Sequence, residues 1–158
     1  MAAPAQAVAQ NLADAGDDVT PIAPWPEPDQ WTGRIDQELL GCRRDLHHRF
    51  LLGGFAARAI RIERAGRAAG YAYISAQGHV GPLAIAPDAD AKAVVTMALR
   101  CALDSGPSRV SMIVPGRADV VMQAVLALGF RIEEPYVLMA SRAFGNWYNY
   151  LPGAPGFM

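Results

Sequence analysis

Hydrophobic residues recur along this chain with two spacings, and the spacing changes near residue 55. Between residues 29 and 54 the apolar positions lie three to four residues apart, with a break near Gly41. This spacing predicts two helices in tandem that end at Gly53–Gly54. From residue 58 the chain carries short alternating or apolar runs separated by "AGR" and "QGH". These runs predict an antiparallel meander with strands over 58–64, 69–76 and 79–86.

The rest of the pattern alternates helices and strands. Residues 88–106 have helical spacing, and Asp88 or Asp90 can cap the start of that helix. The run "RVSMIVP" predicts a strand, "RADVVMQAVLALGF" an amphipathic helix capped by Asp119, and "RIEEP" and "YVLMASR" two final strands. The β–α–β step that leaves strand 79–86 requires a parallel pair with a right-handed crossover. The other pairs are antiparallel, so we expect an α/β fold with a mixed sheet.

A proline interrupts the expected central strand. Pro82 follows Gly81 inside strand 79–86 and has no N–H to donate to a neighbour. Such a pair in a central strand marks a bulge or a split between strands. The alternative is a strand that begins later, at Leu83.

The two ends of the chain differ from the middle. Residues 1–16 are either a short helix stopped by Gly16 or a tail, and "TPIAPWPEPDQW" holds four prolines, which predicts a linker or a poor edge strand. The last residues are aromatic and rich in proline and glycine, which favours a tail that wraps over a surface. We therefore divide the chain into an N-terminal tail and linker (1–28), one folded domain (29–142) and a C-terminal tail (143–158).

Composition removes several classes of function. The chain has 158 residues, enough for one domain with a real core, and a net charge of −1 gives no electrostatic case for nucleic acid or an anionic membrane. No apolar run approaches the roughly 20 residues of a membrane span, and no secretory signal is recognisable. Cys42 and Cys101 are the only cysteines. They make neither a zinc site nor a disulfide framework, so we expect no metal and a cytoplasmic protein with reduced thiols.

The order of elements, taken with several local runs, resembles the GNAT superfamily of N-acetyltransferases. "GHVGPLAIAP" is similar to the fourth strand of that family, "RVSMIVP" with "LALGF" to its fifth strand and fourth helix, and "EEPYVLMASR" to its final strands. "GRAAGYAYI" is similar to its third strand. "GCRRDLHHRFLL", "GPLAIA" and "NYLPGAPGFM" resemble the second half of tandem members, which carry two such domains. The resemblance covers residues 29–142 and implies a GNAT-like mixed sheet with a splayed parallel strand pair flanked by helices.

The resemblance also implies a site for acetyl-CoA. The pantetheine would pair with backbone groups of Leu83, Ala84 and Ile85 in the gap between the splayed strands, and the pyrophosphate would meet a helix N-terminus. The loop that would hold it departs from the family pattern. Asp90 falls where that pattern has arginine, where its carboxylate would repel a phosphate. Alanine or valine replaces the usual glycines, while Lys92 adds positive charge. The cofactor residues implied by the resemblance are Leu83, Ala84, Ile85, Asp90, Ala91, Lys92, Ala93, Val94 and Val95.

Acetyl transfer to an amine also needs a base and an acid. His79, at the start of strand 79–86, has the titration range of a base, and Tyr136 is the candidate acid. The position where many relatives carry the tyrosine acid is Val125, which we expect in the core. His47 and His48 lie in the region where relatives bind their acceptors, and because they are adjacent they point to different faces, so at most one could serve.

Three functions stay open. The first is an acetyl-CoA-dependent N-acyltransferase (a transferase) acting on an unidentified small-molecule or peptide amine. The second is a catalytically degenerate domain of the same fold that acts as a binding, regulatory or dimer-forming module. The third is one half of a tandem enzyme that pairs with a second GNAT domain, or a homodimer, through its apolar surface and aromatic tail.

Overall fold

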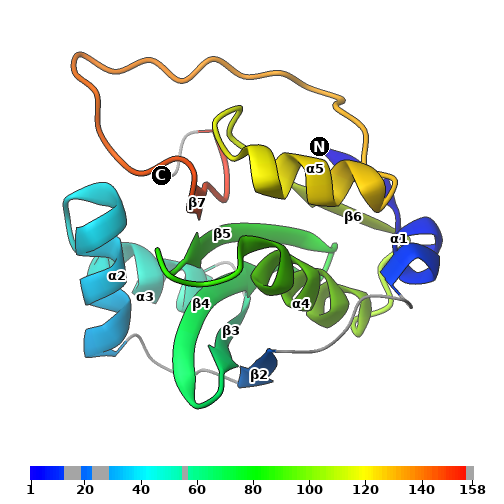
Figure 1. Ribbon diagram of the computed structural model, residues 1–158, viewed down its shortest axis with the longest axis horizontal. Helices are drawn as coiled ribbons and strands as arrows, with labels where there is room; N and C mark the ends of the chain where they lie inside the picture. The colour runs from blue at the N-terminus through cyan, green and yellow to red at the C-terminus, as the bar shows by residue number, and fades with distance from the viewer. Residues whose placement is uncertain (13–18, 23–28, 55–56, 156–158) are drawn as a thin grey trace.

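A curled mixed sheet with helices on both faces forms the body of the protein in the computed structural model (Figure 1). The structure describes residues 1–12, 19–22, 29–54 and 57–155. The strands are β1 (Ala2–Pro4), β2 (Thr20–Ile22), β3 (Arg58–Arg64), β4 (Arg67–Ile74), β5 (His79–Ile85), β6 (Arg109–Met112) and β7 (Tyr150–Leu151). The helices are α1 (Ala5–Leu12), α2 (Gln30–Leu40), α3 (Asp45–Gly54), α4 (Ala91–Leu103) and α5 (Asp119–Ala127).

The strand order is β1-β6-β5-β4-β3-β2, and β7 pairs with β5 off this path. The pair β5–β6 is parallel, and the other strand pairs are antiparallel. The predicted meander, the tandem helices and the β–α–β step are therefore confirmed, and so is the mixed α/β class. The predicted start of α4 is confirmed as well, with Asp90 rather than Asp88 as its cap.

Two hydrophobic cores lie on opposite faces of the sheet. The larger core joins α1, α4 and α5 to one face, where Leu83 and Ile85 of β5 are fully buried. The smaller core joins α2 and α3 to the other face, where Tyr71 and Tyr73 of β4 are fully buried. Because side chains alternate along a strand, Ala84 of β5 faces the smaller core.

The bulge predicted at Gly81–Pro82 is confirmed. The register between β4 and β5 shifts between Ala72 and Ile74, so Ala72 pairs with Leu83 while Ile74 pairs with Val80. The alternative, a strand that begins only at Leu83, is wrong because β5 already pairs from His79. The irregular stretch lies at the point where β5 changes its neighbour from β6 to β7.

The two predicted final strands are absent. Residues 131–140 are exposed throughout, and their one strand-like contact is a bridge from Arg131 to Ala2. The antiparallel position beside β6 is instead held by β1, at the start of the chain. Local hydrophobicity favoured a strand in this segment, but a strand also needs a neighbour, and β1 already occupies that edge of the sheet.

Three smaller expectations also need correction or limits. The C-terminal tail does not only wrap a surface, because Tyr150 and Leu151 are buried and form β7 within the sheet. Asp119 is the first residue of α5 rather than its cap, and the cap residue, Ala118, makes no side-chain bond. Residues 20–22 do form an edge strand, on β3, whereas Gly16 and residues 23–28 of the proline-rich stretch lie outside the described residues. None of the described helices has the length and apolar character that a membrane crossing needs.

Candidate functional site

The parallel strands β5 and β6 separate soon after they meet. Their pairing consists of His79 with Ser111 and Val80 with Met112. Beyond Val80, β5 turns through the Gly81–Pro82 bulge and leaves β6. Beyond this short pairing, the edge of β5 that faced β6 no longer pairs with it, and the backbone of Leu83, Ala84 and Ile85 lines the gap that this leaves beside β5.

The chain itself fills this gap with residues 149–153, which we call the C-terminal segment. Leu83 pairs with Leu151 and Ala84 with Tyr150, and the Ile85 N–H donates to the Asn149 carbonyl at 2.8 Å. These are the backbone groups that a pantetheine chain was expected to meet. In the described conformation they have protein partners.

His79 fastens the C-terminal segment rather than standing free as a base. Its Nε2 lies 2.7 Å from the Gly153 carbonyl, which can only accept, so Nε2 carries the proton of the neutral ring. Its Nδ1 lies 2.9 Å from the Ser111 hydroxyl. Burial lowers the pKa of His79, with the hydrogen bond to Gly153 acting in the opposite direction. Both ring nitrogens are thus engaged within the chain.

Two glycines allow the close approach of the C-terminal segment to β5. A Cβ on Gly153 would lie 2.7 Å from Cδ and 2.8 Å from N of Pro82. Gly81 has a φ of +154°, and a Cβ there would lie 2.9 Å from the Pro152 carbonyl oxygen. The fit of segment against strand therefore depends on the absence of side chains at both positions.

The N-terminus of α4 is capped by its own aspartate. One carboxylate oxygen of Asp90 accepts from the Lys92 N–H at 2.9 Å and the Ala93 N–H at 3.2 Å. These N–H groups are among those that a helix would offer to a phosphate. The carboxylate occupies them and adds a negative charge at the same place.

The other predicted site residues divide between the core and the surface. Val94 and Val95 are fully buried on the inner face of α4, and Ala91, the first residue of α4, is half-buried. Val125 is in the core, as predicted. Tyr136 is 55 % exposed on the unpaired segment, where its hydroxyl donates to Glu134. The structure therefore brings His79 and residues 83–85 to the C-terminal segment but places Tyr136 apart from them on an exposed stretch.

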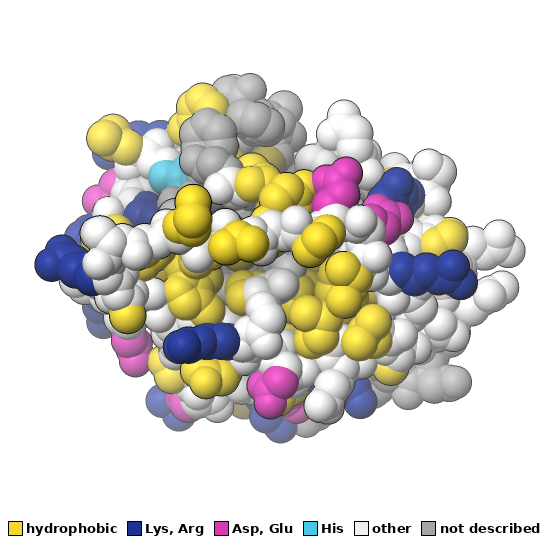
Figure 2. Space-filling view, turned by 90° about the horizontal axis from the view of Figure 1, so that it is seen from above, with side chains coloured by type: hydrophobic (Ala, Val, Ile, Leu, Met, Phe, Trp, Pro, Cys, Tyr) yellow, Lys and Arg dark blue, Asp and Glu magenta, His cyan; other side chains and the backbone are white. Residues whose placement is uncertain are grey.

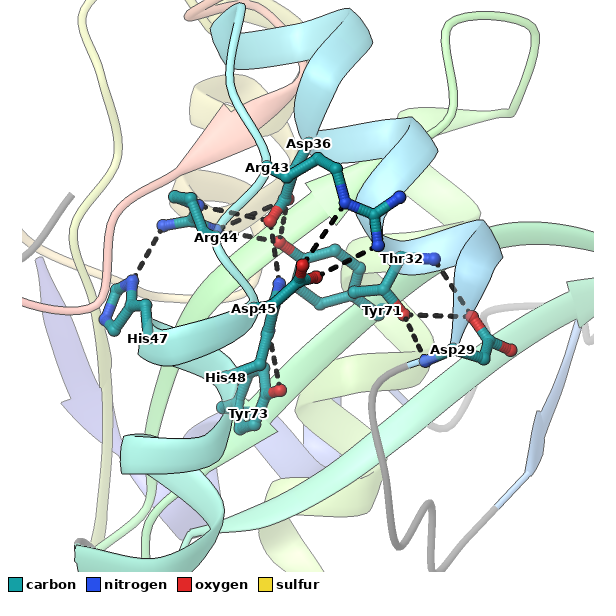
Figure 3. Close-up of polar contacts among 10 residues, drawn as sticks. All are labelled: Asp29, Thr32, Asp36, Arg43, Arg44, Asp45, His47, His48, Tyr71 and Tyr73. Atoms are coloured by element: carbon teal, nitrogen blue, oxygen red, sulfur yellow. Dashed lines mark hydrogen bonds and ion pairs between the residues drawn. The ribbon is translucent and has the colours of Figure 1, made fainter.

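A buried polar cluster on the opposite face of the sheet escaped the sequence analysis (Figure 3). Asp36 of α2 is fully buried, and its carboxylate accepts from Arg44 Nε at 3.2 Å and from His48 Nε2 at 2.7 Å. The Tyr71 hydroxyl donates to the same carboxylate at 2.5 Å and accepts from Arg44 Nη2 at 2.9 Å. Nδ1 of His48 lies 2.8 Å from the Tyr73 hydroxyl. We call these five residues the Asp36 cluster.

The local sequence positions each member of the Asp36 cluster. A capping box between Asp29 and Thr32 fixes the start of α2, and Asp36 lies on the same buried face as Ile35 and Leu39. Tyr71 and Tyr73 are two residues apart on β4 and so point to the same side of the sheet. This i, i+2 pair of tyrosines beneath an expected helix was the signal that could have indicated a polar partner above.

Electrostatics keep the Asp36 carboxyl ionised and the Tyr71 hydroxyl protonated. Burial alone would raise the pKa of the Asp36 carboxyl, but the hydrogen bond from His48, the charge of Arg44 and the Tyr71 hydroxyl outweigh it and lower that pKa. Burial raises the pKa of Tyr71 well above its ordinary value, so its hydroxyl remains a donor. Burial, with the nearby charge of Arg44 next, lowers the pKa of the neighbouring His47 to about 4. His48 is fully buried and His47 is half-buried.

An open cleft of about 790 Å³ lies between α2, the β3–β4 hairpin and the approach to α4. Its polar lining includes Arg34, Arg61, Arg64 and Arg67, against Glu38 and Asp88. Trp31, Ile35, Ala69 and Ala86 are among its apolar lining residues. Arg61 is already engaged, since it pairs with Asp29 at 3.1 Å and lies over the Trp31 ring at 5.3 Å. We call this feature the arginine cleft.

Comparison of the chain with protein-family models, with curated proteins and with solved structures found no match. Among the described residues, no group of three or more His, Cys, Asp or Glu side chains is placed to hold a metal ion.

Proposed function

We propose that this chain is a catalytically silent module with a GNAT-like fold, in which the place of the acyl carrier is taken by the chain's own C-terminal segment. The observation that carries the proposal is the pairing of Leu83 and Ala84 with Leu151 and Tyr150. A strand that already pairs with its own chain has no backbone donors and acceptors left on that edge for a ligand.

The residues that remain do not fit acetyl-CoA in this conformation. The Asp90 carboxylate stands at the helix N-terminus where a pyrophosphate would need donors, and two charges of the same sign about 4 Å apart repel by a few kcal/mol near a surface. His79, the expected base, donates its hydrogen bond to the Gly153 carbonyl and does not face a place for the amine that would receive the acetyl group. The proposal therefore assigns no acyl-transfer step to these groups.

Calorimetric titration with acetyl-CoA tests this proposal. We expect no saturable heat up to about 1 mM ligand, a level at which even weak specific sites respond. In the Gly153→Ala variant the new methyl group would press on Pro82 and should loosen the C-terminal segment. Titration of this variant then tests whether the gap beside β5 can bind acetyl-CoA once the segment is loosened. Gly116→Ala is its matched control, because a Cβ at Gly116 meets nothing within 4 Å. Saturable binding by the intact chain at micromolar concentration would overturn the proposal.

The arginine cleft favours a second candidate function, the binding of an organic anion. Arg34 and Arg67 are exposed, line the cleft and form no ion pair with another described residue. A ligand with an aromatic ring and an anionic group would suit both the arginines and the apolar lining. Phenyl phosphate is a suitable probe. Its affinity should fall in the Arg34→Glu and Arg67→Glu variants but not in Arg49→Glu, an exposed arginine of α3 outside the cleft lining. Equal affinity in all of these variants would remove this candidate.

A further inference from the structure

Residues 131–142, which we call the outer segment, hold five of the ten exposed large hydrophobic residues of the described chain. After α5 the ribbon runs as a long arc to the turn before β7 (Figure 1). Residues 131–142 are all exposed, and among them Val137 is 86 % and Met139 is 85 % exposed. Ile132, Tyr136 and Leu138 are also exposed large hydrophobic residues. Hydrophobic side chains gather on the face of the molecule that carries this arc (Figure 2).

The backbone of this segment lacks strand partners within the described chain, and its large hydrophobic side chains are exposed. Apart from the bridge at Arg131, its N–H and C=O groups belong to no strand pair. An unpaired backbone with hydrophobic side chains is a template for another strand, and a contiguous apolar stretch of this kind marks an interaction surface. What covers it must offer a strand and an apolar face.

We propose that the outer segment pairs antiparallel with the outer segment of a second copy of this chain, about a two-fold axis at Leu138. In this register Leu138 lies opposite Leu138 of the partner subunit, and Val137 lies opposite the partner subunit's Met139. Glu134 lies opposite the partner subunit's Arg142, and the symmetry forms this ion pair twice. The segment is thus complementary to itself in both hydrophobicity and charge, which is the property that a two-fold interface requires.

The proline in the segment supports this register. In an antiparallel pair, alternate residues exchange both backbone hydrogen bonds with the partner, and the residues between them turn their N–H outward. If Leu138 exchanges both bonds, Pro135 lies three positions away and falls on the outward side, where its missing N–H breaks no bond. A register centred on Val137 would instead place Arg142 opposite Ile132 and leave the charge of Glu134 unmatched.

The existing contacts of the segment are compatible with this pairing. Glu133 pairs with Arg109 of its own chain, and because side chains alternate, Glu133 points away from the face that carries Glu134 and Arg142. The Tyr136 hydroxyl donates to Glu134, whose carboxylate has further lone pairs for an arginine. The apolar residues Val120 and Leu126 of α5 are also exposed.

Sedimentation velocity of the full chain from about 1 to 100 µM tests the proposal. We expect a monomer–dimer equilibrium within this range. Leu138→Pro removes the central N–H on both copies and should weaken the dimer at least about tenfold, whereas Val137→Pro is the matched control, because its N–H points away from the partner. Glu134→Arg and Arg142→Glu should each weaken the dimer, and the double variant should restore it.

The outcomes separate the possibilities. A monomer at all concentrations overturns the proposal, and so does a dimer that Leu138→Pro leaves intact, since that dimer uses another surface. Equal weakening by the two proline variants, or failure of the double charge reversal to restore the dimer, would exclude the register centred on Leu138. Because these positions are exposed, unchanged circular dichroism in every variant will show that the fold itself is preserved.

Discussion

At the scale of single residues, we expect a conservative substitution to lower the free energy of unfolding most in the Asp36 cluster. Asp36→Asn leaves the Arg44 guanidinium buried without its counter-charge, and breaking a buried ion pair in this way costs about 3–5 kcal/mol. We expect the free energy of unfolding, measured with urea, to fall by that order. Asp45→Asn is the control. The side chains of Asp45 and its partner Arg43 are 43 % and 49 % exposed, respectively, so this ion pair should contribute less than about 1 kcal/mol. Similar losses in the two variants would contradict the assignment of Asp36 as the centre of the cluster.

A second prediction at this scale concerns the effect of pH through His47. The folded chain keeps His47 neutral down to a pKa of about 4, whereas an unfolded histidine takes up its proton near pH 6.5. Between these values the unfolded state binds more protons than the folded state. The contribution of neutral His47 to the stability of the folded state is therefore complete above pH 6.5 and is lost as the pH falls toward 4. The lowered pKa of His79 adds a change of the same sign. His47→Asn should therefore lose less stability than the parent chain between pH 7 and pH 5 in urea titrations; an identical loss would exclude His47 as a contributor.

At the scale of elements, the sequence predicted what local pattern determines. The meander, α2, α3, α4 and the bulge at Pro82 follow from spacing, capping and the missing proline N–H, all of which act within a few residues. β1 and β7 could not be predicted in this way, because each is two or three residues long and forms only by pairing with strands far along the chain. The same limit explains the outer segment, whose composition favours a strand although its own chain supplies no neighbour. The Asp36 cluster was missed for a related reason, since its members come from α2, the connection between α2 and α3, α3 and β4.

The packing of β7 gives a prediction at the same scale. Gly153→Ala places a methyl group against Pro82, and overpacking of this kind costs about 1–3 kcal/mol. The loss should be local, so the Ile85 amide, which donates to Asn149, should exchange its hydrogen faster while amides of the β3–β4 pair keep their rates. Gly116→Ala should leave both sets unchanged. Unaltered exchange at Ile85 in Gly153→Ala would show that the C-terminal segment does not depend on this contact.

At the scale of the whole molecule, the exposed outer segment and the buried strand that follows it predict how the chain responds to a cut. Chymotrypsin should cleave beside Tyr136 or Leu138 in dilute protein, where the segment is uncovered. The C-terminal piece should stay bound after the cut, because Tyr150 and Leu151 are buried, Arg44 lies over the Tyr150 ring at 4.7 Å and His79 holds Gly153.

Gel filtration of the cleaved protein should give one peak that contains both pieces, and urea should separate them. Raising the protein concentration before digestion should slow the cut if the outer segment is covered by a second copy, and it should leave the rate unchanged in the Leu138→Pro variant. A C-terminal piece that leaves the body under native conditions would mean that β7 is held only through its covalent link. The gap beside β5 would then be open in solution, and the pairing of β7 with β5 would no longer support the proposal that the module is catalytically silent.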